Sequence, residues 1–308
     1  MTHKKTRLGV IAALAVAAFT PSISSAQFLD LSRYSFSARY AQGPAEGSAI
    51  TYDWDTNSLW IAEDEGRSLT NFNMDGTYRG SIALRGFQDV EALSYAGNGA
   101  FFVGDERRMT ISYAKPLYQT IDKATASTYK FGDQSPNEGI EGFSYDPISG
   151  EMFAVKEIRP QGVYQADIDF SQTTATGTHW DLFDPALLGV QTISDIQVLS
   201  YFQGTSYASN FLILSATTNM LLEVTRSGQI LSSMSLAPYN DKIEGVTIDH
   251  EGNIWLVAES GGDPTYGQFF KFAAPIPEPG TYAMFAAGLG VVGAVVRRRK
   301  QKDDAAQA

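Results

Sequence analysis

The feature that most constrains the fold is one hairpin pattern repeated along the chain. Five units begin with an alternating strand at spacings of 43, 50, 56 and 47 residues: SAITYD at 48, EALSYA at 91, EGFSYD at 141, QVLSYF at 197 and EGVTID at 244. A turn and a second strand follow in each unit, as in LWIAEDE from 59 and IWLVAE from 254. A period of roughly 40 to 50 residues made of short strands is typical of a β-propeller, in which each repeat is one blade.

The two ends of the repeat region indicate how the ring closes. The last unit has a third strand, QFFKF at 268–272, and no fourth strand, whereas RYSFSARYA at 33–41 is a strand without a nearby partner. Used as the outer strand of the last blade, this N-terminal segment closes the ring without a free edge. We predict an all-β fold, a single five-bladed β-propeller with four-stranded antiparallel blades over residues 27–274. Six blades is the alternative, because the segments 115–136 and 171–192 have room for further elements.

Residues 1–26 are expected to be a signal peptide and not part of the propeller. A basic start at Lys4, Lys5 and Arg7 is followed by a short apolar run and the small residues Ser24, Ser25 and Ala26. This order is that of a secretory signal peptide, and the apolar run is too short for a stable membrane span.

Residues 275–308 form a tail of different composition. The segment 281–296 has no charged residue, and Arg297, Arg298, Arg299 and Lys300 follow it directly. Sixteen residues are slightly fewer than the ~20 of a full membrane span, and flanking arginines compensate by extending to the interface. The tail is therefore predicted to hold a short transmembrane helix with a basic end, and an ordinary C-terminal anchor is one interpretation.

A more specific interpretation rests on Pro277, Glu278 and Pro279, directly before that helix. With the apolar helix and the arginine cluster, they make the tail resemble a PEP-CTERM sorting tail. The resemblance implies an exosortase-type processing enzyme as a partner and membrane contact through the C-terminal helix before processing. It also implies export across the inner membrane to the cell envelope, cell surface or extracellular matrix of a Gram-negative bacterium.

The net charge limits the possible partners. The chain has 23 basic and 34 acidic residues, of which the two ends hold eight and three, so residues 27–276 carry 15 basic and 31 acidic groups. Such a surface repels nucleic acids and anionic membranes and attracts cations. We therefore expect no nucleic-acid partner. The chain also has no cysteine, which excludes disulfides, thiolate metal sites and cysteine nucleophiles.

Acidic residues recur at two positions of the repeat. Glu91, Glu141 and Glu244 start the first strands, which line the central channel of a propeller, and a ring of carboxylates is costly unless a cation neutralises it. Calcium suits such a site because it takes six to eight oxygen ligands. Carboxylates at the ends of the second strands give a further set, for which ion pairing or solvation is the alternative: Asp64, Glu106, Glu157 and Glu259. We predict a metal site formed by Glu91, Glu141, Glu244, Glu106, Glu157 and Glu259.

The segments DVEALSY to FVGDER at 89–107 and IEGVTID to GNIWLVAE at 243–259 resemble the SdiA-regulated, or YjiK-like, family. The resemblance covers most of residues 30–272 and implies a five-bladed propeller with a bound calcium ion, but no established activity. The chain departs from the pattern in its first unit, which has Ser48 and Ala49, and in its fourth, which has Gln197 and Val198. A site built from first-strand acids is thus expected to be incomplete in these two units.

Two functions remain open. The first is an exported, calcium-binding interaction module that presents one face to a partner such as exopolysaccharide or another envelope component. The second is a calcium-dependent hydrolase of esters, lactones or phosphoesters, with the metal on the propeller axis. The propeller segment has only His179 and His250, so neither a Ser-His-acid triad nor a multi-histidine zinc site can be assembled. No catalytic residue is predicted.

Overall fold

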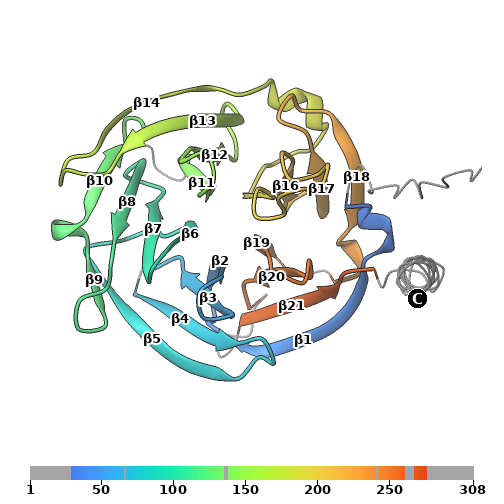
Figure 1. Ribbon diagram of the computed structural model, residues 1–308, viewed down its shortest axis with the longest axis horizontal. Coiled ribbons are helices and arrows are strands. Elements are labelled where there is room, and N and C mark those ends of the chain that lie inside the picture. The colour runs from blue at the N-terminus through green and yellow to red at the C-terminus, as the bar shows by residue number, and fades with distance from the viewer. Residues whose placement is uncertain (1–28, 66, 135–137, 240–241, 261–266, 276–308) are drawn as a thin grey trace, which may run out of the picture.

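The computed structural model describes residues 29–65, 67–134, 138–239, 242–260 and 267–275. Five sheets stand around a central axis, each with its first strand near the axis and its last strand at the rim (Figure 1). The predicted five-bladed propeller with four-stranded antiparallel blades is confirmed. The predicted signal peptide at 1–26 and the motif Pro277, Glu278 and Pro279 lie outside the described residues.

Blades one to three follow the repeat in chain order. Blade one contains β2 (Gly47–Asp53), β3 (Ser58–Glu63), β4 (Ser68–Asn73) and β5 (Tyr78–Arg85). Blade two contains β6 (Ala92–Gly97), β7 (Ala100–Asp105), β8 (Thr110–Ala114) and β10 (Ser127–Lys130). Blade three contains β11 (Ile140–Tyr145), β12 (Met152–Lys156), β13 (Gly162–Asp169) and β14 (Thr176–Asp181).

Blades four and five complete the ring. Blade four contains β15 (Asp195–Val198), β16 (Phe211–Ser215), β17 (Met220–Val224) and β18 (Ile230–Ser235). Blade five contains β19 (Ile243–Ile248), β20 (Ile254–Ala258) and β21 (Gly267–Ala273), and its outer strand is β1 (Ser35–Gly43), which pairs antiparallel with β21. The predicted closure by the N-terminal strand is therefore confirmed.

The long segments between repeats hold short elements and no sixth blade. β9 (Thr120–Asp122) crosses from blade two and pairs parallel with β5, so the sheet of blade one has a fifth strand at its rim (Figure 1). The described 3-10 turns are η1 (Leu31–Arg33), η2 (Lys123–Thr125), η3 (Pro185–Leu188) and η4 (Ala237–Tyr239). Within the described residues, no helix is long and apolar enough to cross a membrane.

The hydrophobic core lies between the blades. Five clusters of buried side chains occur, one at each junction between neighbouring blades. The junction between blades five and one, for example, packs Trp255 and Phe269 against Tyr52 and Phe72, all at most 2% exposed. Burial of apolar surface thus holds each blade to its neighbours, because a single four-stranded sheet cannot bury both of its faces alone.

Hydroxyl side chains join the inner strands near the axis. Thr51, Ser94, Ser144 and Thr247 occupy the same position of four blades, and each accepts a hydrogen bond of 3.0–3.1 Å from a backbone N–H of the next blade. In blade four this position is Gln197, whose side-chain carbonyl accepts the Thr247 hydroxyl at 3.0 Å. These bonds fix the inner strands in one register, so equivalent residues of different blades lie at the same height along the axis.

Candidate metal site at the acidic mouth

The strand pairing shows which residues are equivalent at one end of the axis. Three residues before the hydroxyl position lie Ser48, Glu91, Glu141, Ser194 and Glu244, which we call the inner positions. The ends of the second strands place Asp64, Glu106, Glu157, Ala216 and Glu259 beside them, which we call the outer positions. We call this end of the propeller the acidic mouth, and all six predicted ligands lie there.

The fourth unit needs a correction. The sequence alignment started this unit at Gln197, but β15 pairs Asp195 with Leu214 as β11 pairs Gly142 with Val155. Ser194 therefore takes the inner position, three residues earlier than expected, and Asp195 takes the position that is glycine or alanine in the other blades. Asp195 is buried between blades, where its carboxylate accepts the backbone N–H of Val246 at 2.8 Å. The shift is not apparent from the repeat motif, because Asp195 replaces the glycine or alanine that marks this position in the other blades.

Local backbone geometry turns the inner glutamates out of the sheets. The pairing of β11 with β12 skips Glu141, and the pairing of β19 with β20 skips Glu244, so both residues lie at bulges. A bulge leaves its extra residue unpaired and redirects the side chain. Each of these glutamates is followed by a glycine, because the neighbouring blade is close at this point. A Cβ on Gly142 would lie 2.4 Å from the Asp195 carboxylate.

The inner glutamates lie close enough to influence one another across the axis. Glu91 of blade two interacts with Glu244 of blade five, and Glu244 interacts with Glu157 of blade three. Neither pair belongs to neighbouring blades, so these interactions cross the centre of the ring. The acidic mouth is therefore one connected cluster of carboxylates and not five separate loop ends.

Burial and like charge raise the pKa of the inner glutamates. The pKa of Glu91 is raised to about 9, first by burial and then by Asp89, Asp64 and Glu244. That of Glu141 is raised to about 11 by burial and by Glu106, Glu91 and Glu157. The pKa of Glu244 is raised to about 7 by burial, Glu259 and Glu157, with partial compensation by Lys242. The carboxylate form of each is destabilised because too few positive groups lie nearby.

The outer acids differ in how they are compensated. Glu106 is buried and accepts the backbone N–H of Gly139 at 2.8 Å, which ties blade two to blade three. Glu259 pairs with Lys242 at 2.8 Å. No hydrogen bond or ion pair from the described residues reaches Glu157, whose pKa is raised by burial. Ion pairing or backbone contact thus accounts for two of these predicted ligands, and Glu157 remains uncompensated.

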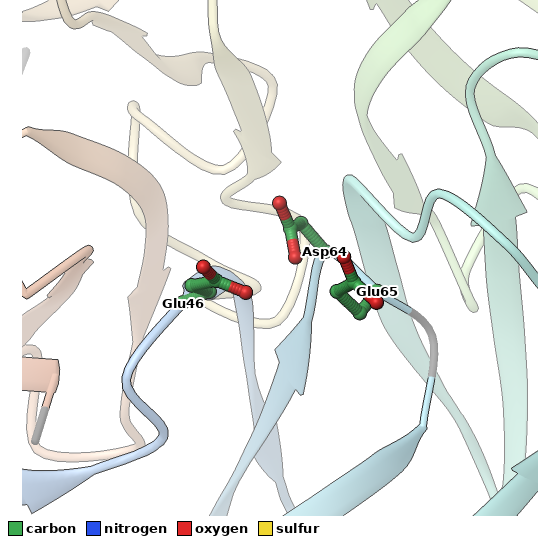
Figure 2. Close-up of side chains that lie close together, drawn as sticks. All are labelled: Glu46, Asp64 and Glu65. Carbon is green, nitrogen blue, oxygen red and sulfur yellow. The ribbon is translucent and has the colours of Figure 1, made fainter. Parts of the chain in front are cut away.

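One carboxylate at the edge of this cluster, that of Glu46, was not predicted from the sequence. Glu46, Asp64 and Glu65 have carboxylate oxygens that all lie within 4.8 Å of one another (Figure 2). Within the described parts of the chain, this is the one group of three or more possible ligands at such spacing, and the six predicted ligands do not form another. Glu46 is equivalent to Asp89 and Lys242, two residues before the inner position, and aligning the units further upstream would have revealed it.

The donor set at the acidic mouth fits a hard cation. All candidate ligands are carboxylate oxygens, which calcium prefers, and no histidine of the described segments lies among them. One oxygen, Oδ1 of Asp64, is buried and accepts no hydrogen bond from any described residue. The pKa of Asp64 is raised to about 6 by burial and by Glu46, as expected for a carboxylate that lacks a positive partner.

Both histidines of the described segments lie elsewhere. His179 is on β14, where its ring nitrogen lies 2.9 Å from the Tyr129 hydroxyl and its ring stacks on Phe131. His250 follows β19 at the opposite end of the axis, and its ring nitrogen lies 2.5 Å from the Tyr52 hydroxyl. Both are held by tyrosines, as expected for structural histidines.

Comparisons with solved structures show the fold alone. A glutaminyl cyclase from Myxococcus xanthus is 8% identical, with a TM-score of 0.54 over 80% of this chain and 97% of that chain. A luciferin-regenerating enzyme is 10% identical, with a TM-score of 0.48 over 77% and 95% of the two chains. The structure of a nidogen/laminin complex is 12% identical, with a TM-score of 0.48 over 70% and 73%.

Comparisons with protein families cover nearly the whole propeller and the tail. Residues 275–300 match the PEP-CTERM protein-sorting motif, which indicates export and sorting to the cell surface. Residues 29–272 match the sequence model of the SdiA-regulated family, a span that includes all five blades. The chain therefore belongs to the SdiA-regulated family and carries a PEP-CTERM sorting motif behind its propeller.

Proposed function

We propose that this protein is an exported, calcium-binding propeller that acts as an interaction module in the envelope or extracellular matrix of a Gram-negative bacterium. The observation that carries this proposal is the burial of Glu91, Glu141 and Glu244 close together at the acidic mouth, where burial and neighbouring carboxylates destabilise the charged form of each. A divalent cation among them would stabilise the carboxylate form of these side chains.

The inner glutamates are the principal ligands in this proposal. Glu157 and the Asp64 oxygen without a donor supply further carboxylates, and Glu106 and Glu259 contribute less because each already has a partner. Glu46 and Glu65 lie at the outer edge of the cluster, where Arg67 already pairs with Glu65 at 2.9 Å. Their role is to raise the local concentration of cations.

A binding role is favoured over hydrolysis by the surroundings of the acidic mouth. Neither described histidine lies there, and the described cations nearest to the acids are held in ion pairs: Lys242 with Glu259 at 2.8 Å and Arg107 with Asp89 at 2.8 Å. A hydrolase needs a positioned base or acid whose pKa lies near the working pH. The pKa of Glu244 is raised to about 7 and those of Asp64 and Asp89 to about 6, but no hydrogen bond from a described side chain positions Glu244 as a base or acid.

Titration calorimetry of the purified protein with calcium tests the proposal. We expect one saturable site whose affinity falls at least about tenfold in Glu141→Gln and in Glu244→Gln, since each substitution removes a charged ligand. Glu251→Gln is the matched control, because Glu251 is exposed near the opposite end of the axis. Unchanged affinity in both inner variants would refute the ligand assignment, and calcium-dependent turnover of an ester, lactone or phosphoester panel would refute the binding role.

A further inference from the structure

A cleft lies at the outer rim of the propeller, where blades one, two and three meet, and its aromatic part lies toward the face opposite the acidic mouth. β8 and β13 both run away from the acidic mouth, so the residues that follow them emerge on the opposite face. β9, which crosses to blade one, supplies the third wall (Figure 1). The cleft has a volume of about 660 Å³, within the range of about 300–1,000 Å³ usual for ligand sites.

Aromatic rings line the side of the cleft nearest to blade three. Tyr113 and Phe170 lie 6.0 Å apart between ring centroids, and both pack against Phe102 at 5.1 and 5.0 Å. Phe102 is buried, whereas Tyr113 is 36% exposed. A smaller recess of about 300 Å³ continues from the cleft and shares Tyr113 and Phe170. The two rings therefore pack against a buried residue and line both the cleft and the recess.

A strained turn displays a third ring at the rim. Leu117 and Thr120 exchange both backbone hydrogen bonds, at 2.8 and 3.0 Å, and between them Tyr118 and Gln119 have φ angles of 52° and 59°. Asparagine and glycine are the usual residues at these two positions, because the left-handed backbone conformation strains most other residues. The Tyr118 side chain is 93% exposed and lines the cleft. Strain and exposure of an aromatic residue together mark a site of function.

The turn is anchored, so its tyrosine has a defined position. The Gln119 carbonyl accepts the backbone N–H of Ala83 at 2.9 Å, which continues the pairing of β9 with β5. On the facing wall, the Thr173 carbonyl accepts the backbone N–H of Thr128 at 3.0 Å. Backbone bonds between blades therefore hold both walls of the cleft in place.

The remaining lining is polar with little charge. Hydroxyl and amide side chains come from Thr125, Thr173 and Gln172, while Arg85 pairs with Asp122 at 3.5 Å. Lys115 is the other charged residue of the lining, so the cleft lacks the acidity of the rest of the propeller. Sugar rings have apolar C–H faces that stack on aromatic rings and peripheral hydroxyls that bond to neutral polar groups. The lining combines both kinds of contact.

We propose that this cleft binds a saccharide chain, with Tyr118, Tyr113 and Phe170 stacking on successive sugar rings. This inference rests on the proposed function for its class of partner, an envelope polysaccharide, but it uses the outer rim of the propeller and none of the candidate metal ligands. Because residues 27–276 carry about twice as many acidic as basic groups, neutral chains are favoured over uronate-containing ones.

A glycan array followed by titration calorimetry tests this proposal. The array carries neutral hexose oligosaccharides and uronate-containing oligosaccharides, and the strongest binder is titrated into the wild-type protein and two variants. Tyr118→Gly removes the displayed ring and relieves backbone strain, so we expect an unchanged or higher Tm and a Kd that is about tenfold weaker or more. Gln119→Gly relieves the same strain and keeps the ring, so its Kd stays within about twofold of wild type.

A proline-rich peptide is titrated as a separate probe, because such peptides also bind aromatic grooves. Three outcomes would overturn the saccharide site: no binding to any saccharide on the array, equal binding by Tyr118→Gly and the wild-type protein, or binding of the peptide alone. The same titration in excess chelator separates this site from the calcium proposal. Saccharide binding that persists without calcium supports an independent cleft. Loss of saccharide binding in Tyr118→Gly with unchanged calcium affinity supports it further, whereas a calcium affinity that stays unchanged in Glu141→Gln and Glu244→Gln refutes only the acidic mouth.

Discussion

The two ends of the propeller axis bury acidic residues with opposite consequences. At the far end, Asp53, Asp146 and Asp249 follow the first strands and are at most 4% exposed. Asp249 accepts the backbone N–H groups of Glu251 and Asn253 and the Trp255 indole N–H, each at 2.9 Å. Burial raises the pKa of Asp146, but hydrogen bonds from Ser200, Ile148 and Arg226 outweigh it, so the net shift is downward.

At the acidic mouth the same kind of burial raises the pKa, because donors are few and other carboxylates are near. The two ends also differ in access. Trp54 of blade one and Tyr201 of blade four stack with centroids 4.0 Å apart, and since these blades are not neighbours the stack crosses the axis at the far end. The number of hydrogen-bond donors nearby, and not burial alone, therefore distinguishes a structural acid from a candidate ligand.

The largest expected effect is at the far end. Asp249→Asn replaces one carboxylate oxygen by an amide that cannot accept from Trp255 or Asn253. Leaving buried donors without an acceptor should lower the free energy of unfolding by about 3 kcal/mol. Urea denaturation monitored by tryptophan fluorescence measures this, and a loss below ~1 kcal/mol would show that the far-end acids are not structural.

The next effect concerns calcium and pH at the acidic mouth. The pKa of Glu244 is raised to about 7 and that of Glu91 to about 9, so above the ordinary pKa of 4.5 the folded state holds more protons than the unfolded state. Without calcium, stability should therefore fall as the pH rises from 4.5 through these values. A calcium concentration of about 100 times the Kd at pH 8 should raise the free energy of unfolding by ~2.7 kcal/mol at pH 8. The same concentration should raise it much less at pH 5, where the glutamates are protonated.

Urea titrations at both pH values, with calcium and with chelator, give these four free energies of unfolding. An equal gain from calcium at pH 5 and pH 8 would contradict the idea that the raised glutamates bind the ion.

A smaller effect of opposite sign to that of Asp249→Asn is expected for Glu141→Gln. The amide resembles the protonated glutamate, and because the pKa of Glu141 in the folded state is raised to about 11, the variant avoids the free-energy cost of keeping this carboxyl protonated at pH 8. In chelator at pH 8 the variant should be more stable than wild type by about 1 kcal/mol, within the range of single substitutions. The same carboxylate-to-amide change is thus expected to stabilise the protein at one end of the axis and to destabilise it at the other. Changes in Tm of the same sign for both variants would contradict this difference between the two ends.

The smallest effect is expected for Lys242→Ala. Lys242 is 69% exposed and pairs with Glu259 at 2.8 Å, so its loss should change stability by no more than ~0.5 kcal/mol. Because a cation leaves the acidic mouth, calcium should bind about twofold more tightly at low salt, and the gain should shrink at high salt. Lys130→Ala, which breaks an exposed pair with Asp133, is the control and should leave the calcium affinity unchanged.

Much of the fold could be predicted because it depends on local pattern. Strand alternation located β2 (Gly47–Asp53), β19 (Ile243–Ile248) and their partners, and the strand missing after QFFKF predicted the closing role of β1 (Ser35–Gly43). The register of blade four was wrong, because Ser194 and Asp195 break the motif that marks the inner position. Only the pairing of Asp195 with Leu214 reveals the equivalence.

The candidate site could be predicted by position but not by compensation. The repeat placed Glu91, Glu141 and Glu244 at one end because equivalent residues of a ring share one height. It could not tell that Glu106 bonds to Gly139 of the next blade or that Glu46 joins Asp64, because these contacts come from separate segments. The cleft was invisible for the same reason, since its walls come from three blades.

The sequence by itself determined the number of blades, the closure of the ring, the recurrence of acids at strand ends and the sorting motif, because each is written in spacing and residue type along one stretch of chain. Only the tertiary structure decided which acids find donors, which face one another across the axis, and where Tyr118 is displayed. These depend on residues that are distant in sequence, and in a propeller blades that are not neighbours come together around one axis only when the ring has closed.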